Sequence, residues 1–228
     1  MLTHTAIRTG YREVANNPAP RAPMPSGSIV TAIDLMGATM PYGRDSEIYG
    51  EGEPADYVYK VVVGAVRTYK LLEDGRRQIA SFYLPGDIFG LETGEDHSFS
   101  AEAISDSKIL VVERKALLSL ATRDSEVARQ LWLVMGQELK RVQDHILVLI
   151  KTAKERVVSF LLEMAERDPN GNDIVLPMSR QDIADYLGIT METVSRTLTE
   201  LENCASIKLT SARRIVLRNR RALGLLNS

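Results

Sequence analysis

Cysteine is nearly absent from this chain of 228 residues, which contains only Cys204. A single cysteine excludes a disulfide bond within the chain and any thiolate cluster supplied by one chain. Histidine is also scarce, with His4, His97 and His145 spread over an N-terminal tail, a loop and a helix. We expect all three at the surface, so the sequence predicts no metal site built from histidine and carboxylate ligands. An enzyme that depends on such a site is disfavoured.

Long apolar runs are missing as well. No stretch approaches the roughly 20 residues that a helix needs to cross a bilayer, and residues 1–14 lack the apolar core of a signal peptide. Hydrophobic residues make up 44% of the chain and charged residues 25%, as in ordinary soluble proteins. We therefore expect a cytoplasmic protein without a membrane partner.

Acidic residues slightly outnumber basic ones, 30 to 28, which at first argues against a nucleic-acid partner. Residues 1–150 hold 16 basic and 20 acidic residues, a net charge of −4, whereas residues 151–228 hold 12 and 10, a net charge of +2. The basic residues near the end are Lys208, Arg213, Arg214, Arg218, Arg220 and Arg221. One basic module is enough for phosphate contacts, although a solvated run of charge is the alternative.

Residues 179–201, SRQDIADYLGITMETVSRTLTEL, have the apolar period of two short helices. The apolar positions are Ile183, Ala184 and Leu187 in the first helix, and Val194, Leu198 and Leu201 in the second. Gly188 stands where the first helix must end and turn, and Thr190 is a suitable N-cap for the second. Ser179 is the expected N-cap of the first helix, with a phosphate contact as the alternative. The pattern predicts a helix-turn-helix.

The second helix turns polar side chains away from its apolar face, at Glu192, Ser195, Arg196 and Thr199. Arginine can donate two hydrogen bonds to guanine, glutamate accepts from the cytosine amino group, and serine or threonine serves either role. These residues fit the major groove of DNA, and a solvated helix face is the alternative. Residues expected to assist DNA binding are Met191, Thr190, Thr193, Thr199, Ser179 and Arg180.

The run PMSRQDIADYLGITMETVSRTLTELE resembles the DNA-binding helices of the CRP/FNR transcription factors, and residues 192–196, ETVSR, match the E-x-x-S-R version. In that version the three outward residues read TTGA-type half-sites, which the resemblance transfers to Glu192, Ser195 and Arg196. Met191 is a position where family members vary, and the resemblance gives it a role at the outer bases. Nearly the whole chain resembles the FixK-like branch.

Residues 33–113 contain short β-type runs separated by glycines, which predicts a sandwich or barrel. The predicted strands are 57–63, 65–70, 78–83 and 108–112, with a tight hairpin turn at 73–75. The order of these runs resembles the jelly-roll effector domain of the same family. Jelly-roll enzymes of the cupin kind need a cluster of metal ligands that this chain lacks.

Family members that bind cyclic AMP carry a glycine and a glutamate, followed by an arginine and a small hydroxyl residue, around the nucleotide. The matching stretch here is GLETGEDHSFSAEA, in which Gly90 and Glu92 are kept. Residues 91–104 contain no arginine or lysine, and they add several carboxylates. A buried phosphate without a basic partner is costly, so we predict no cyclic nucleotide and no cofactor.

Residues 125–151 predict a long helix with apolar residues at alternating steps of four and three, which indicates a coiled-coil seam. The seam residues are Met135, Leu139, Val142, Ile146 and Leu149, continued by Ala153. We expect a parallel homodimer, in which two recognition helices lie about one turn of DNA apart and read a palindrome. A helix buried against its own domain is the alternative.

Beyond the second helix, residues 206–209 and 213–217 predict a hairpin that completes a winged helix-turn-helix. We expect Lys208, Arg213 and Arg214 of this wing to contact phosphate. Cys204 lies just past the recognition helix, where either a structural thiol or a redox-active one is conceivable.

Together these features predict an α+β protein with an N-terminal antiparallel β jelly roll like those that bind cyclic nucleotides, a long dimerisation helix and a C-terminal winged helix-turn-helix. The expected segments are a flexible lead-in at 1–30, the jelly roll at 31–120, the dimerisation helix at 121–153 and the DNA-binding domain at 154–228. We predict a transcription activator that reads a TTGA/TCAA-type palindrome as a homodimer.

The resemblance implies control of genes for low-oxygen respiration or nitrogen fixation. It also implies a contact with RNA polymerase through surface loops such as 73–77. A ligand-gated regulator of the same fold, responding to a small effector, is the alternative.

Overall fold

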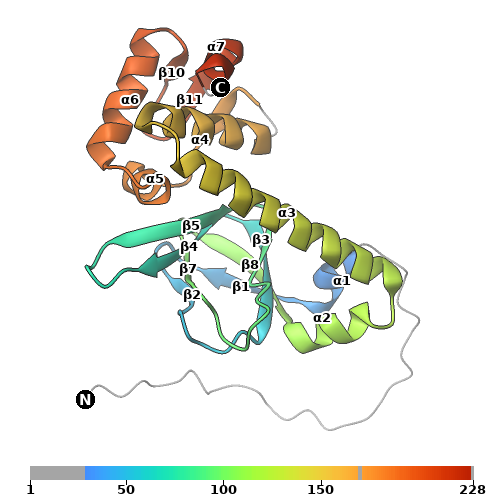
Figure 1. The fold of residues 1–228 in the computed structure, drawn as a ribbon. Helices are drawn as coiled ribbons and strands as arrows, with labels where there is room; N and C mark the ends of the chain where they lie inside the picture. The colour runs from blue at the N-terminus through green and yellow to red at the C-terminus, as the bar shows by residue number, and fades with distance from the viewer. Residues whose placement is uncertain (1–28, 169–170, 227–228) are drawn as a thin grey trace.

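The computed structural model describes residues 29–168 and 171–226. It consists of a β domain and a C-terminal helical domain, joined by helix α3 (Ser125–Leu149), which runs along the first domain toward the second (Figure 1). Helix α1 (Ile29–Met36) precedes the β domain, where the sequence predicted the end of an irregular lead-in and the first β-type residues. The rest of the lead-in predicted for residues 1–30 lies outside the described residues.

The β domain is made of two antiparallel four-stranded sheets, with strand orders β1-β8-β3-β6 and β2-β7-β4-β5. The strands are β1 (Ala38–Tyr42), β2 (Glu47–Tyr49), β3 (Tyr57–Val63), β4 (Val66–Leu71), β5 (Arg77–Tyr83), β6 (Ile88–Phe89), β7 (Ser100–Ala103) and β8 (Ser107–Glu113). Aromatic and branched side chains such as Tyr59, Val61 and Phe89 are buried together in one core cluster of the domain. This arrangement confirms the predicted jelly roll.

The four predicted strands correspond to β3, β4, β5 and β8, with ends shifted by no more than one residue. The prediction missed β1, β2, β6 and β7 because these strands are short and their residues lack a clear apolar alternation. The predicted tight turn joins β4 to β5, where Gly75 has a φ of +82°.

His97 was predicted at the surface, and this prediction was wrong. The side chain is 2% exposed, and its ring stacks on Tyr49 with 3.5 Å between the ring centroids. His145 is also partly buried, stacked on Tyr186 at 4.0 Å. An imidazole ring packs well against an aromatic face, and no sequence period marks such a contact. In the described residues, no group of three or more histidine, cysteine or acidic side chains is arranged to hold a metal ion.

Helix α3 follows the shorter helix α2 (Arg114–Ala121) and begins at Asp124, whose carboxylate accepts hydrogen bonds from the backbone N–H groups of Glu126 and Val127. One face of α3 packs on the β domain through Val127 and its neighbours. None of the described helices is both long enough and apolar enough to cross a bilayer.

Helix α3 ends at Leu149, and α4 (Ala153–Arg167) starts a new helix three residues later. Thr152 and Glu155 form a capping box that fixes this start, because each side chain accepts a hydrogen bond from the other's backbone N–H. The predicted continuation of the apolar seam to Ala153 was therefore wrong. The segment predicted as one helix, 121–153, contains the end of α2, the whole of α3 and a break.

The C-terminal domain contains α4, β9 (Asp173–Val175), α5 (Arg180–Leu187), α6 (Met191–Asn203), β10 (Ile207–Leu209), β11 (Arg214–Leu217) and α7 (Arg220–Leu225). Its strands form a small sheet in the order β10-β11-β9. All six apolar positions predicted for the two DNA-binding helices are buried. Each fully buried aliphatic side chain of this core stabilises the fold by about 1.5–3 kcal/mol. The predicted winged helix-turn-helix is confirmed.

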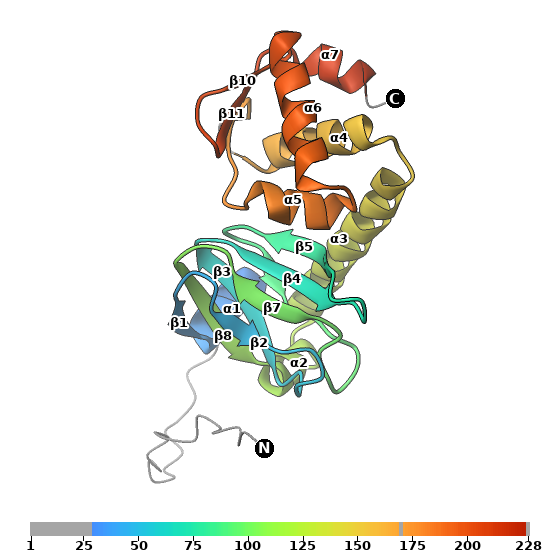
Figure 2. The ribbon, with the colours of Figure 1, turned by 90° about the vertical axis from the view of Figure 1, so that its left-hand side faces the viewer.

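Helix α5 lies between the two domains, against strand β5 (Figure 2). Tyr186 of α5 packs on Phe82 of β5, with ring centroids 5.1 Å apart, and on Phe160 of α4 at 5.9 Å. Because these rings belong to one buried cluster, the hydrophobic core of the C-terminal domain continues into the β domain.

We expect Gly188→Ala to lower the free energy of unfolding by about 1 kcal/mol, because Gly188 has a φ of +62° and L-residues are strained there. The matched variant Gly136→Ala, within α3, should raise it by up to about 1 kcal/mol, since alanine favours helix and an added Cβ meets no atom within 4 Å. Urea denaturation at one protein concentration measures both. If both variants changed the free energy of unfolding in the same direction, the left-handed conformation of Gly188 would not explain the result.

Candidate nucleic-acid interface

Helix α5 is held at both ends by local contacts. At its start, the Ser179 hydroxyl accepts a hydrogen bond from the Asp182 N–H at 3.0 Å, and the Asp182 carboxylate accepts from the Ser179 N–H at 2.9 Å. At its end, Gly188 takes the left-handed conformation and its N–H donates to the Ala184 carbonyl. Arg156 of α4 donates to the Leu187 carbonyl at 2.9 Å. These contacts fix the turn that leads into α6.

Helix α6 begins at Thr190, whose hydroxyl accepts a hydrogen bond from the Thr193 N–H at 3.2 Å. The side chains of Glu192 and Arg196 on the opposite face from the core are exposed, and Ser195 between them is half-buried. Neither Glu192 nor Arg196 makes a side-chain hydrogen bond or an ion pair with any described residue. The three residues predicted to read bases therefore share one face, and its two charged groups are free to bind a partner.

The threonines predicted to assist are partly used within the protein. The hydroxyls of Thr190 and Thr193 lie 3.0 Å apart, and that of Thr199 donates to the Ser195 carbonyl at 3.1 Å. Met191 is exposed at the start of the helix. Among the residues predicted to assist, Met191 therefore presents the most available side chain on α6.

The three wing cations differ in their availability. Arg214 makes a two-point contact with Asp173, with Nε to Oδ1 at 2.9 Å and Nη2 to Oδ2 at 2.6 Å, and this contact lowers the pKa of Asp173. Lys208 is exposed and Arg213 is half-buried, and neither side chain pairs with a described residue. Because Asp173 precedes Arg214 by 41 residues, no local pattern in the sequence indicates that Arg214 is already paired.

Two more of the predicted residues are Cys204 and Arg180. Cys204 is the residue that ends α6, and its thiol is exposed and unpaired. Arg180 is half-buried in the first turn of α5, next to Ser179.

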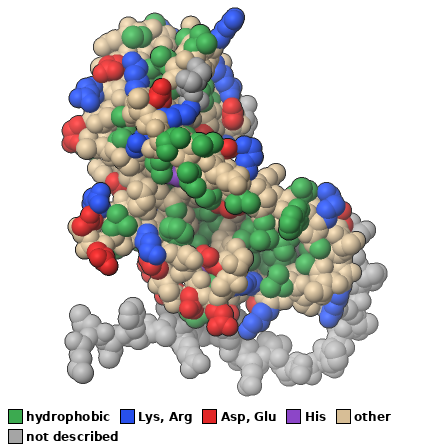
Figure 3. Space-filling model, in the orientation of Figure 1, with side chains coloured by type: hydrophobic (Ala, Val, Ile, Leu, Met, Phe, Trp, Pro, Cys, Tyr) green, Lys and Arg blue, Asp and Glu red, His purple; other side chains and the backbone are tan. Residues whose placement is uncertain are grey.

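Four side chains of the predicted seam are exposed on α3 in this protomer, and Figure 3 shows hydrophobic side chains along this helix. The exposed seam residues are Met135, Leu139, Val142 and Ile146, and Trp132, Leu133, Leu147 and Ile150 are also exposed along or just past the helix. Leu149, the fifth seam residue, is half-buried. An apolar strip of this length on a monomer is typical of an interaction site.

A cavity of about 470 Å³ lies between α3 and the β domain, and the seam residues Val142, Ile146 and Leu149 line it on the side of the helix. Gly90 and Glu92, the residues matched to the cyclic-nucleotide site, line it together with Tyr83 and Glu138. The Tyr83 hydroxyl donates to the Glu138 carboxylate at 2.9 Å, and burial, followed by the charge of Glu138, raises the pKa of Tyr83. None of the described residues that line the cavity is an arginine or a lysine.

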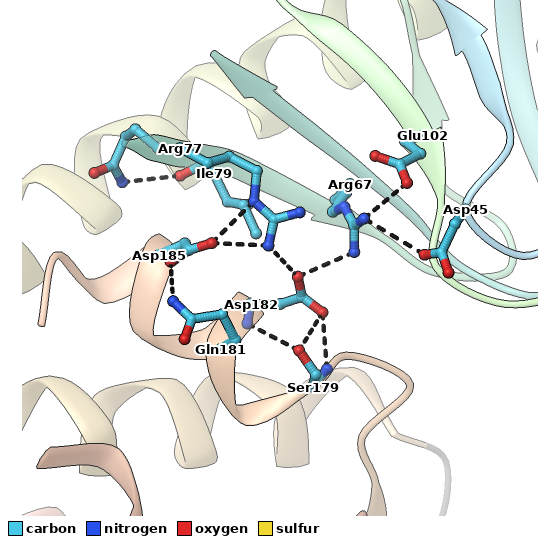
Figure 4. Close-up of polar contacts among 10 residues, drawn as sticks. Asp45, Arg67, Arg77, Ile79, Glu102, Ser179, Gln181, Asp182 and Asp185 are labelled. Carbon is cyan, nitrogen blue, oxygen red and sulfur yellow. Dashed lines mark hydrogen bonds and ion pairs between the residues drawn. The ribbon is translucent and has the colours of Figure 1, made fainter. Parts of the chain in front are cut away.

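Four charged residues join the two domains in a contact that the sequence did not predict (Figure 4). Asp182 Oδ1 accepts from Arg67 Nη1 at 3.0 Å and from Arg77 Nη2 at 2.6 Å, while Arg77 Nε donates to Asp185 at 2.9 Å. We call Arg67, Arg77, Asp182 and Asp185 the interdomain clamp. Because the Arg77 side chain belongs to this clamp, the exposed part of the loop predicted to meet RNA polymerase is residues 73–76.

Comparison with known protein families supports the assignment of both domains. Residues 39–124 match the cyclic nucleotide-binding domain and residues 155–226 match the Crp-like helix-turn-helix domain. The chain is similar to the nitrogen fixation regulation protein FixK of Azorhizobium caulinodans, at 50% identity over 202 residues, which cover 86% of this chain and 82% of that protein.

Two further comparisons bear on the whole chain. The transcriptional activatory protein AadR of Rhodopseudomonas palustris is 40% identical over 71% of this chain and 70% of its own length. The structure of FixK2 from Bradyrhizobium japonicum superimposes with a TM-score of 0.81 at 53% identity, covering 84% of this chain and 98% of that one.

We expect Arg77→Gln to lower the free energy of unfolding by about 1–3 kcal/mol, the usual cost of losing hydrogen bonds to charged groups in a partly buried site. Arg76→Gln is the matched control, because Arg76 is exposed at the hairpin turn and pairs only with Asp74. This control should stay within about 0.5 kcal/mol of the unaltered protein in the same urea titration. Equal stability of the two variants would mean that the clamp does not stabilise the domain contact.

Proposed function

The chain belongs to the CRP/FNR family of transcription regulators, and we propose that it reads a TTGA/TCAA-type palindrome as a homodimer. Its relatives are DNA-binding regulators of transcription rather than enzymes. The observation that carries the proposal is the outward face of α6, where Glu192 and Arg196 are exposed and unpaired on a helix whose start, turn and core are fixed.

Base reading follows from the chemistry of that face. In the major groove, the Arg196 guanidinium can donate two hydrogen bonds to O6 and N7 of a guanine. The Glu192 carboxylate can accept from the amino group of a cytosine, and Ser195 can contact a neighbouring base. Lys208 and Arg213 then contact phosphates, which hold the helix in position without reading sequence. Arg214 has a smaller part in this scheme because Asp173 already holds it.

The homodimer is supported by the exposed apolar strip on α3. Pairing two such strips about a twofold axis buries Met135, Leu139, Val142 and Ile146 of both protomers, as in a coiled coil. The same axis relates the two recognition helices, so a palindromic site with half-sites about one helical turn apart matches the protein.

We further propose that DNA binding requires no cyclic nucleotide or other cofactor. The lining of the cavity supports this, because it includes Glu92 and Glu138 but no arginine or lysine of the described residues to pair with a cyclic phosphate. The cavity also supports a second candidate function, a regulator gated by a small effector that is not a phosphate. Calorimetry with cyclic nucleotides, and DNA binding by the purified protein with nothing added, distinguish these functions.

The names of the relatives support a role in controlling nitrogen-fixation genes, and family resemblance adds genes for low-oxygen respiration. The relative called an activatory protein supports activation, which requires a contact with RNA polymerase. We place this contact at the exposed hairpin turn, residues 73–76. Footprinting on promoters with TTGA/TCAA palindromes, without any ligand, tests the proposal, and protection that depends on an added effector would favour the second function.

Arg196→Ala should weaken binding to the cognate palindrome by about 1–3 kcal/mol for each lost arginine–guanine contact. Binding to random DNA should change little, because phosphate contacts dominate there. Fluorescence anisotropy with both duplexes measures the two affinities. A loss of equal size on both duplexes would show that Arg196 contacts phosphate only.

Val142→Glu should convert the dimer to monomers, because each protomer would bring an unpaired carboxylate into the apolar seam. Met135→Glu should have the same effect. The matched control is Gln143→Glu, which adds the same charge at the next residue of α3, outside the seam. Sedimentation velocity gives the oligomeric state, and an unchanged dimer in both seam variants would remove this face of α3 from the interface.

A further inference from the structure

A cavity of about 530 Å³ opens at an edge of the β domain away from α5, where β1 and β2 are the edge strands of their sheets (Figure 2). Its lining contains four tyrosines, Tyr42, Tyr49, Tyr57 and Tyr59, and we call it the tyrosine pocket. It shares only Tyr49 with the cavity beside α3, so it is a separate site. Its volume lies within the range of about 300–1,000 Å³ that is usual for sites of small molecules.

Strand register explains why this pocket is open. Tyr59 of β3 pairs with Val111 of β8, which pairs with Ala38 of β1, so these side chains share one face of the sheet. Further along β3 this face belongs to the interior of the domain, where Val61 is fully buried. At the β1 edge the face is covered less well, because the edge strand β2 of the other sheet has only three residues, and Met40 of β1 is 47% exposed. The pocket is therefore a part of the interior that the domain leaves open to solvent.

Tyr59 carries a hydroxyl group without a partner in this pocket. The residue is 5% exposed, yet its hydroxyl makes no hydrogen bond with any described residue. Burial raises the pKa of this hydroxyl, and it is raised further by side chains that all line the pocket, those of Tyr42, Tyr57, Glu53 and Asp56. The hydroxyl therefore faces the pocket. Because buried polar groups nearly always have a partner, it indicates a group that binds there.

The charged groups of the pocket are acidic. The Asp56 carboxylate pairs with no described residue, and the Glu53 carboxylate accepts only the backbone N–H of Gly50, at 3.1 Å. None of the described residues that line the pocket is an arginine or a lysine. Arg114 donates its backbone N–H to the Asp56 carbonyl, but its guanidinium donates to two other backbone carbonyls. The lining thus combines aromatic rings with two carboxylates that no cation of the described chain pairs with.

We propose that the tyrosine pocket binds a small quaternary ammonium compound that also carries an oxygen function, such as choline. The faces of aromatic rings attract such a cation, and the two carboxylates add to the attraction. A primary ammonium or a guanidinium fits less well, because it would bring several N–H donors into a lining that offers them few acceptors. A quaternary ammonium has no N–H, and the oxygen of the ligand can take the hydrogen bond that Tyr59 leaves unmade.

The test is a titration of the full-length protein with choline, followed by saturation transfer to the N-methyl protons in NMR spectra. Choline should give a saturable signal. The neutral analogue 3,3-dimethylbutan-1-ol has the same shape and the same hydroxyl but no charge, so its Kd should be at least about tenfold higher. A neutral analogue that binds as tightly as choline would overturn the proposal, and so would the absence of a saturable signal from choline.

Two variants of Tyr57 test the role of the ring. Tyr57→Leu should raise the Kd for choline about two- to fivefold, the effect of losing one cation–π contact at a half-exposed site. Tyr57→Phe keeps the ring and should stay within about twofold of the unaltered protein. Since Tyr57 is 43% exposed, both variants keep the core of the domain. An equal loss in both variants, or no loss in Tyr57→Leu, would overturn the proposal.

Asp56→Asn removes the unpaired carboxylate and should raise the Kd for choline about two- to fivefold, as for other partly exposed charge pairs. The matched control is Asp74→Asn, which makes the same change at the hairpin turn, away from the pocket, and should leave the Kd unaltered. If Asp56→Asn bound choline like the unaltered protein, or if both variants lost the same affinity, choline would bind elsewhere and the proposal would fall. The proposed function would still stand, because the pocket contains no residue of the helix-turn-helix.

Discussion

The position of the helix-turn-helix depends on one carboxylate, that of Asp182. One of its oxygens accepts hydrogen bonds from the backbone N–H and the hydroxyl of Ser179 and so starts helix α5, while the other accepts from Arg67 and Arg77 of the β domain. The residue is 3% exposed, and these four donors surround its carboxylate. A local capping contact and a contact between domains thus share one group. Any movement of α5 away from the β domain leaves the buried Arg67 and the half-buried Arg77 without their common partner.

Aromatic packing beside the clamp also joins α5 to the β domain, without charged groups. Tyr186 of α5 packs against Phe82 of the β domain, Phe160 of α4 and His145 of α3, so one ring contacts three other segments. Burial lowers the pKa of His145, which keeps the ring neutral and suited to stacking in the physiological range. The clamp fixes the orientation of α5 relative to the β domain, and the rings bury apolar surface between the two domains. Together these contacts make α5 part of both domains.

Local sequence patterns predicted most of what defines the DNA-binding helices. Ser179, Gly188 and Thr190 act through neighbours within four residues, and the apolar period of α6 lies in the sequence itself. The contacts that were missed join distant positions: Arg67 and Asp182 are 115 residues apart, and Arg214 and Asp173 are 41 apart. The apolar alternation along a strand does not indicate which carboxylate an arginine of that strand will contact. For the same reason, the sequence predicts the same phosphate contact for Arg213 and Arg214, whereas in the folded protein Arg214 is paired and Arg213 is not.

The contacts between α3 and the β domain explain how a member of this fold can hold its arrangement with its own side chains. In the cavity beside α3, the Tyr83 hydroxyl reaches Glu138 of the helix, and burial keeps that hydroxyl protonated and able to donate. Further along α3, Asp87 of the β domain pairs with Arg141 of α3 and with Arg167 of α4. These contacts connect the β domain to α3 and α4 through the chain's own side chains. A ligand in the cavity could shift the arrangement of the domains only by its preference for one state over another.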